Sequence, residues 1–139
     1  MKIYFAGAVR AGRENQEVYQ QIIEHLKKYG QVLTEHIGRS DLTVEGESLP
    51  EEKIFERDMG YLKEADVLVA EVSTPSLGVG YEIAVAERLG KRVFCLYKKP
   101  ENGRKVSGMI KGNKNLTLKQ YDDLPEALQF IDERFSNGQ

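Results

Sequence analysis

Two carboxylates lie at helix positions whose neighbours are apolar. Glu82 is followed three, four and seven residues later by apolar side chains (Val85, Ala86 and Leu89), which places it on the apolar stripe of a predicted helix. Asp58 has apolar residues three and four positions away in both directions, at Ile54, Phe55, Tyr61 and Leu62. Carboxyl groups on such faces are partly buried, and two of them in different surroundings can have different pKa values, as the acids of a catalytic pair do. Asp58 could instead be a solvated surface residue.

A pair of this kind can cleave a glycosidic bond. One ionised carboxylate attacks the anomeric carbon while a second, protonated acid assists departure of the leaving group. Glu82 lies near the N-terminus of its helix, where the helix dipole favours an anion, so we predict that it is the nucleophile. Asp58 is then the acid.

Other polar side chains lie in segments expected to border these acids. Tyr4, in the first predicted strand, could direct its hydroxyl at the carboxylate or the ligand, or be an ordinary strand aromatic. Arg10 and Arg13 could pair with a phosphate, although loop arginines are usually solvated. Ser76 could donate to a phosphate oxygen, or form a turn beside Pro75.

The sequence carries no convincing cofactor motif. Gly78-Val79-Gly80 is followed three residues later by Ile83 rather than by glycine or alanine, which argues against a dinucleotide fingerprint. His25 and His36 have no partner at metal-ligand spacing. The single cysteine, Cys95, lies in an apolar segment and is expected to be a core residue. We therefore predict neither a metal nor an organic cofactor.

Strand-like and helix-like segments alternate along the chain. The predicted strands cover residues 2–6, 31–35, 66–72, 92–97 and 116–121. The predicted helices are one that ends at Gly30, one that opens with capping-box spacing at residues 48–51 and runs to about residue 65, one that follows the loop 73–80 and ends near Gly90, and one capped at residues 123–126. A short helix is expected within residues 105–111, and the polar segment 38–48 is expected to be a mobile loop.

A single α/β domain, residues 1–139, is the expected architecture. The alternation predicts a parallel sheet with helices on both faces, and we expect a flavodoxin-like three-layer sandwich with five strands in the order 2-1-3-4-5. In that order a ligand binds at the switch point between the first and third strands, beyond their C-terminal ends. The loops that leave those strands are residues 7–13 and 73–80, so both would border the same crevice.

Composition excludes several classes of protein. The chain has 139 residues, of which 40% are hydrophobic and 30% charged, as expected for one globular domain with one core. Its net charge of −2 argues against a protein that binds nucleic acid through bulk electrostatics. No apolar run approaches the length of a membrane span. We expect a cytoplasmic protein, or one that is also nuclear if its source is eukaryotic.

Four sets of residues spread over nearly the whole sequence form a recognisable pattern: Tyr4-Phe5-Ala6-Gly7 with Arg10, Asp58, Ser76-Leu77-Gly78-Val79-Gly80-Tyr81-Glu82 and Ser107-Gly108-Met109-Ile110. This pattern resembles the nucleoside 2-deoxyribosyltransferase superfamily, and within it the branch of 2′-deoxynucleoside 5′-monophosphate N-hydrolases. It implies that Glu82 forms an ester with C1 of the deoxyribose, that Asp58 helps the base to leave and then activates water, and that Tyr4 orients the nucleophile.

The resemblance also implies a set of substrate-binding residues, namely Gly7, Arg10, Ser76, Gly78, Gly80, Ser107 and Met109. Ser76 matches a position that is acidic in the transferases and serine in the hydrolases, and a neutral residue there suits a phosphate because an acid would repel it. Ser107 and Met109 match residues that reach the site from a second subunit, so a homodimer is expected. The chain departs from the hydrolases at Ala8, where they commonly carry serine.

These observations predict hydrolysis of the N-glycosidic bond of a 2′-deoxynucleoside 5′-monophosphate, to free base and 2-deoxyribose 5-phosphate, through a glutamate ester. Two other activities remain open within the superfamily: transfer of deoxyribose between bases, and hydrolysis of a ribonucleotide such as CMP. A non-catalytic nucleotide-binding module is the alternative of another class.

Overall fold

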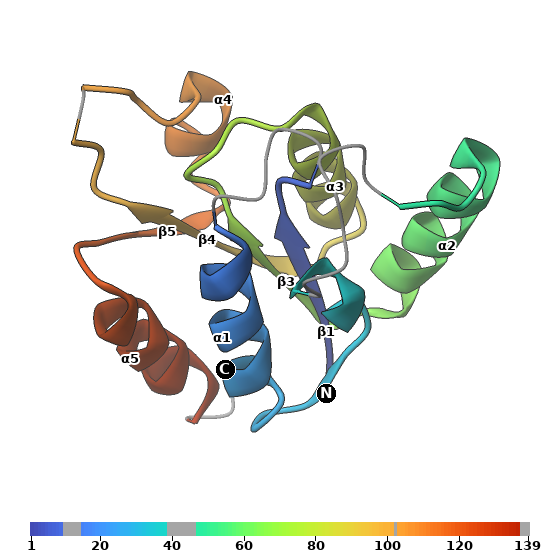
Figure 1. Cartoon of the computed structure of the whole chain (residues 1–139), viewed down its shortest axis with the longest axis horizontal. Helices are drawn as coiled ribbons and strands as arrows, with labels where there is room; N and C mark the ends of the chain where they lie inside the picture. Colours follow the sequence, from blue (N-terminus) through green and yellow to red (C-terminus); the bar gives the residue numbers. More distant parts are fainter. Residues whose placement is uncertain (10–14, 39–46, 102, 137–139) are drawn as a thin grey trace.

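Five parallel strands form one sheet in the order β2-β1-β3-β4-β5 (Figure 1), which confirms the predicted topology. The strands are β1 (Lys2–Gly7), β2 (Gln31–Val32), β3 (Val67–Glu71), β4 (Arg92–Lys98) and β5 (Thr117–Tyr121). This computed structural model describes residues 1–9, 15–38, 47–101 and 103–136. Arg10 and Arg13, and most of the segment 38–48 that we expect to be mobile, lie outside the described residues.

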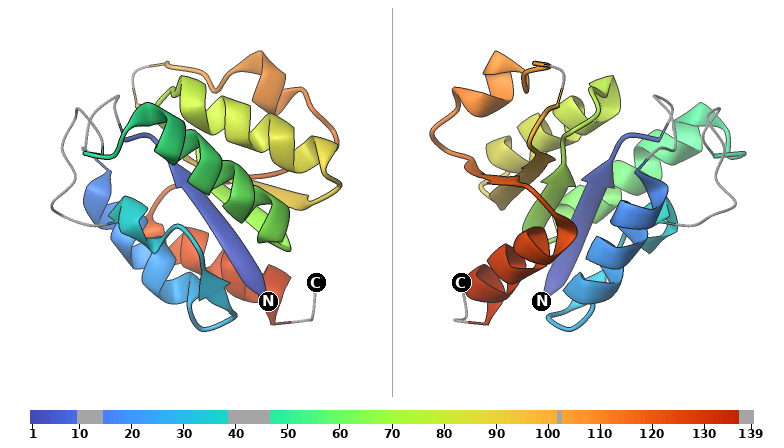
Figure 2. Two further views of the ribbon diagram at one scale, coloured as in Figure 1. Left: turned by 90° about the vertical axis from the view of Figure 1, so that its right-hand side faces the viewer. Right: turned by 60° about the vertical axis from the view of Figure 1, so that its left-hand side comes forward.

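Helices cover both faces of the sheet (Figures 1 and 2). The helices are α1 (Gln16–Leu26), the 3₁₀ helix η1 (Glu35–Gly38), α2 (Glu51–Glu64), α3 (Leu77–Arg88), the short α4 (Gly108–Lys111) and α5 (Leu124–Phe135). α1 and α5 pack on one face, whereas α2 and α3 lie side by side on the other. No described helix combines the length and hydrophobicity needed to cross a bilayer.

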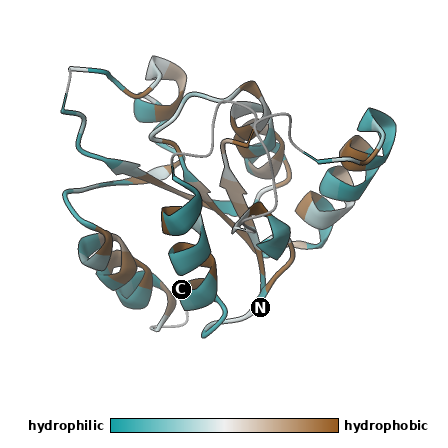
Figure 3. Ribbon diagram, viewed as in Figure 1, coloured by the Kyte–Doolittle hydropathy of each residue, from teal (hydrophilic) through white to brown (hydrophobic). Residues whose placement is uncertain are grey.

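Alternation along β1 divides the core between the two faces. Ile3 and Phe5 pack with α1 and α5, while Tyr4 and Ala6 point to the face covered by α2 and α3. Apolar residues accordingly concentrate in the strands and on the inner sides of the helices (Figure 3). The consequence for function is that Tyr4 is directed toward the two helices that carry Asp58 and Glu82.

β2 is shorter than the sequence predicts. We expected a strand over residues 31–35, but β2 contains only Gln31 and Val32. The hydroxyl of Thr34 accepts a hydrogen bond from the backbone N–H of Phe5 (2.8 Å) and donates one to the carbonyl of Phe5 (2.6 Å). A longer β2 would form its backbone hydrogen bonds with these same two groups of β1. The Thr34 side chain therefore replaces strand pairing at this point, and the chain continues into η1.

Two helices begin at other residues than predicted. The expected capping box at residues 48–51 does not form, because α2 begins at Glu51 and its N-cap is Pro50, which makes no side-chain hydrogen bond. The residue before a proline is disfavoured in the helical conformation, so the helix does not begin earlier. α3 begins at Leu77, inside the expected loop 73–80, so Gly78 and Gly80 are helical. By contrast, the expected cap of the last helix is confirmed: the Asp123 carboxylate accepts a hydrogen bond from the N–H of Glu126 (3.1 Å).

Candidate active site

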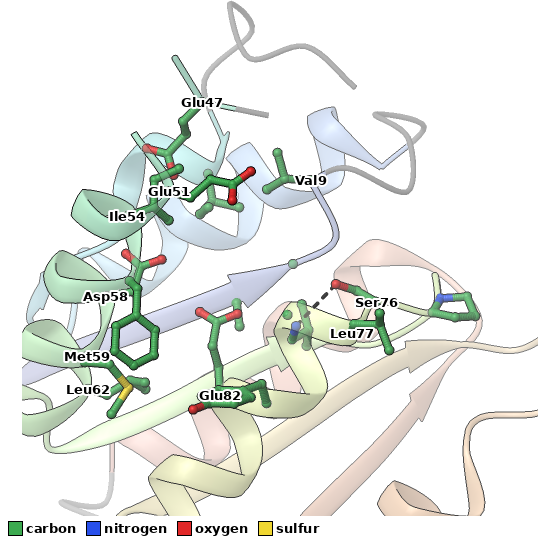
Figure 4. Close-up of a pocket in the computed structure, with 18 residues that line it drawn as sticks. Val9, Glu47, Glu51, Ile54, Asp58, Met59, Leu62, Ser76, Leu77 and Glu82 are labelled. Carbon is green, nitrogen blue, oxygen red and sulfur yellow. Dashed lines mark hydrogen bonds between the residues drawn. The ribbon is translucent and has the colours of Figure 1, made fainter. Parts of the chain in front are cut away.

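A cavity of about 860 Å³ lies at the C-terminal ends of β1 and β3, between α2 and α3. Its size falls within the range of about 300–1,000 Å³ that is typical of small-ligand sites. β1 contributes Ala6 and Gly7, α2 contributes Asp58, and α3 contributes its N-cap Ser76 and, in its second turn, Glu82. The cavity therefore occupies the predicted switch point, and Figure 4 shows the carboxylates of Asp58 and Glu82 directed into it from neighbouring helices.

Tyr4 holds the Glu82 carboxylate from the sheet. The hydroxyl of Tyr4, which is only 1% exposed, donates a hydrogen bond to Oε2 of Glu82. Burial raises the pKa of Glu82 to about 7, the hydrogen bond from Tyr4 opposes that rise, and the negative charge of Asp58 adds to it. Burial and the Glu82 carboxylate both raise the pKa of Tyr4, so the phenol stays protonated and acts as a donor.

Asp58 is less buried and is paired with a cation. Its side chain is 25% exposed, and Nε of the adjacent Arg57 donates a hydrogen bond to Oδ1 of Asp58 at 2.9 Å. Burial raises the pKa of Asp58, and the charge and hydrogen bond of Arg57 oppose that rise.

The pKa of Glu82 differs from the expectation based on the helix dipole. Glu82 is the sixth residue of α3, which begins at Leu77, and the dipole acts mainly within the first turn. Burial therefore outweighs the dipole, and the carboxyl is close to half protonated near neutral pH. The catalytic roles of the two acids stay predictions.

The burial of Glu82 predicts a pH-dependent effect of its neutralisation on stability. The pKa of Glu82 lies near 7 in the folded protein and has an ordinary value of 4.5, so the folded state binds more protons between these values. The free energy of unfolding therefore falls as pH rises through this window, by about 3 kcal/mol for a shift of this size. A Glu82→Gln variant escapes that loss and should be more stable than the wild type at about pH 8, with the difference shrinking toward pH 5.

Urea denaturation at the two pH values measures this effect, because every other titrating group is common to both proteins. An equal stability difference at both pH values would contradict the burial of a titrating carboxylate at position 82.

The beginning of α3 lines one part of the cavity. Ser76 is the N-cap of α3, and its Oγ accepts a hydrogen bond from the N–H of Val79 at 3.2 Å (Figure 4). The N–H groups of Leu77 and Gly78 belong to the first turn of α3, where amides lack an intrahelical acceptor and can bind an anion. Gly7 also lines the cavity, and a Cβ atom there would approach the ring of Tyr19 to 2.8 Å, so a larger residue would have to displace that ring.

Three of the expected substrate-binding residues do not line this cavity. Gly80, Ser107 and Met109 border a second cavity of about 670 Å³ between α3 and the α4 segment. Ser107 is the N-cap of α4, with its Oγ accepting from the N–H of Met109 at 3.2 Å, and Met109 is 84% exposed. Arg10 lies outside the described residues, and Ala8 is fully buried.

Within the part of the chain that the structure describes, no three His, Cys, Asp or Glu side chains gather as metal ligands would. Cys95 is buried in the core, as predicted, and burial raises the pKa of its thiol to about 12. It is therefore a structural residue and not a nucleophile.

Several residues that line the cavity were not predicted to belong to the site. Its apolar wall contains Ile54, Phe55, Met59 and Tyr81, and its rim contains Glu47, whose carboxylate is joined to Arg57. Arg57 could have been noticed as the neighbour of Asp58. Glu47 carried no signal, because it lies in a polar segment with no periodicity.

Known proteins resemble the chain over most of its length. A family model described as nucleoside 2-deoxyribosyltransferase matches residues 3–118. A protein of Nematostella vectensis named putative 2′-deoxynucleoside 5′-phosphate N-hydrolase 1 is 46% identical over 134 residues, which cover 91% of this chain and 90% of the relative. The 5-hydroxymethyl-dUMP N-hydrolase of Esox lucius is 43% identical over 129 residues, covering 91% and 88% of the two chains. The structure of a CMP N-glycosidase of Clostridium botulinum shares the fold, with a TM-score of 0.71 at 20% identity, over 96% of this chain and 99% of that one.

Proposed function

Because the chain belongs to the nucleoside 2-deoxyribosyltransferase family, we propose that it hydrolyses the N-glycosidic bond of 2′-deoxynucleoside 5′-monophosphates. The products are a free nucleobase and 2-deoxyribose 5-phosphate. Relatives that are 43–46% identical over 91% of the chain are named as N-hydrolases of such nucleotides. The observation that carries the proposal is that two partly buried carboxylates, Asp58 and Glu82, line one cavity, which is also lined by the N-terminus of α3.

The proposed reaction is a double displacement. The Glu82 carboxylate attacks C1′ of the deoxyribose and forms an ester, while the bond from C1′ to the base nitrogen breaks and Asp58 gives its proton to the departing base. A water molecule then attacks C1′, Asp58 takes its proton, and the ester bond breaks to regenerate Glu82. The hydrogen bond from Tyr4 fixes the attacking carboxylate and supports its ionised form.

We propose that the phosphate binds at the start of α3, through the hydroxyl of Ser76 and the amides of Leu77 and Gly78. In the same proposal the enzyme is a homodimer, and Ser107 and Met109 of one subunit complete the site of the other. Two observations support the dimer: Leu77 is 97% and Met109 84% exposed, and both border the second cavity. Sedimentation equilibrium tests it, and a monomer at micromolar concentration would contradict it.

The activity is tested by incubating the pure protein with deoxyribonucleotides, including 5-hydroxymethyl-dUMP, and with the corresponding ribonucleotides and free nucleosides. Chromatography of the released base measures hydrolysis. Exchange of bases on free nucleosides would identify a transferase, and release from ribonucleotides alone a ribonucleotide hydrolase. Thermal stabilisation by nucleotides without any turnover would identify a binding module and overturn the proposal.

Ser76 offers a test of phosphate recognition. Aspartate is also a good N-cap, so Ser76→Asp should fold normally while placing a negative charge at the proposed phosphate site. An aspartate carboxylate beside the substrate phosphate places two negative charges next to each other, which costs several kcal/mol of binding free energy. We therefore expect KM for the monophosphate to rise by about 100-fold. The matched control is Ser76→Asn, which keeps the cap without the charge and should change KM far less. Equal KM values for the two variants would place the phosphate elsewhere.

A further inference from the structure

Arg57 joins Asp58 to the rim of the cavity. Its Nη1 and Nη2 atoms donate to the two carboxylate oxygens of Glu47 at 2.6 and 2.7 Å, and its Nε donates to Asp58 at 2.9 Å. The guanidinium thus binds one carboxylate with two parallel hydrogen bonds and the proposed acid with a third. A lysine could not reproduce this arrangement, because an ammonium group is a point charge without a planar set of donors.

This contact is more than an exposed ion pair. The side chains of Arg57, Glu47 and Asp58 are 22%, 16% and 25% exposed, respectively. Pairs that are partly withdrawn from water are screened less than surface pairs, and two-bond geometry fixes their orientation. On α2 the pair Lys53–Glu56 provides a contrast, with a separation of 3.5 Å and exposed fractions of 68% and 66%.

We propose that Arg57 and Glu47 form a positioning clamp that holds Asp58 in the cavity and sets the pH range in which the two carboxylates act. The proposal rests on the proposed function, because it assigns Asp58 the work of an acid and base. Arg57 and Glu47 act through Asp58 and need not touch the reacting atoms.

Arg57 and Glu47 carry opposite charges and have opposite effects on the pKa values of the nearby carboxyl groups. Arg57 lowers the pKa of both Asp58 and Glu82, whereas Glu47 raises both. Three further groups face this region: His36 of η1, whose Nε2 lies 3.2 Å from Nη2 of Arg57; Glu82 of α3; and Tyr4 of β1. Glu51, at the start of α2, also lines the cavity. Neutralising Arg57 should therefore raise the pKa values of Asp58 and Glu82, and neutralising Glu47 should lower them.

The test compares pH profiles of kcat/KM on a hydrolysed deoxynucleotide. Arg57→Met removes the charge and should shift the profile to higher pH by about one unit, while Glu47→Gln should shift it to lower pH. Arg57→Lys keeps the charge and should leave the profile near that of the wild type, but lower kcat by about tenfold because Asp58 loses its orientation. Lys53→Met is the matched control on α2 and should leave both quantities unchanged.

The ¹³C chemical shift of the Asp58 carboxyl gives a readout that does not depend on turnover. Its titration midpoint should rise in Arg57→Met and fall in Glu47→Gln, and an unchanged midpoint in both variants would overturn the clamp. If Arg57→Met fails to fold, the direction of the Glu47→Gln shift decides the same question. A wild-type protein without hydrolase activity but with these shifts would refute the proposed function, while showing that Arg57 and Glu47 still control the pKa of Asp58.

Discussion

Replacing Glu82 by glutamine should lower kcat on a 2′-deoxynucleoside 5′-monophosphate by about 10⁴-fold, which is the size of loss that follows removal of a covalent nucleophile. Glutamine has the same shape and its carbonyl can still accept the hydrogen bond from Tyr4, so the fold and the substrate cavity should persist. An amide, however, cannot form the ester. Released base is measured by chromatography, and the ester itself is sought by mass spectrometry of the wild-type protein quenched in acid.

Two comparisons make this result specific. Glu56 is an exposed carboxylate on α2, two residues from Asp58, and Glu56→Gln should leave kcat within about twofold because surface substitutions have small effects. Substrate binding to Glu82→Gln, measured by calorimetry, should remain. Turnover above a tenth of the wild-type rate would rule out Glu82 as the nucleophile, and the site would then have to work by direct attack of water.

The arrangement of elements is the part of the molecule that local sequence patterns determine best. Buried strands such as β3, whose residues 67–70 are all apolar, stand out in the sequence, and their alternation with helices leaves few possible topologies. Boundaries were less accessible, because they depend on tertiary contacts. β2 ends early because the Thr34 side chain binds the backbone of Phe5, and that contact spans 29 positions in the sequence.

The site divides in the same way. Helical periodicity placed Glu82 and Asp58 toward the core, and the topology brought their helices to one crevice. Periodicity carries no information on how deep a carboxylate lies, so the sequence favoured an ionised Glu82 where burial raises its pKa to about 7. It also could not pair Arg57 with Glu47, since no repeat links a helix residue to an irregular segment ten positions earlier.

Replacing Asp58 by asparagine should lower kcat by about 10²- to 10⁴-fold, the contribution usual for a general acid or base. Arg57 keeps its two hydrogen bonds to Glu47 in this variant, and the asparagine carbonyl can accept the third, so the local structure should be retained. The loss therefore reflects the missing proton transfer and not a rearranged cavity.

The signature of an acid is the dependence of rate on the leaving group. Without Asp58 the base must leave with less assistance, so less basic leaving groups should suffer less: the loss in Asp58→Asn should be smaller for 5-fluoro-dUMP than for dUMP. The rate would thus depend more steeply on the basicity of the leaving base in the variant than in the wild type. If the rate depends equally on leaving-group basicity in both proteins, Asp58 is not the proton donor. If the variant is slowed only in breakdown of the ester, Asp58 activates water and does nothing more.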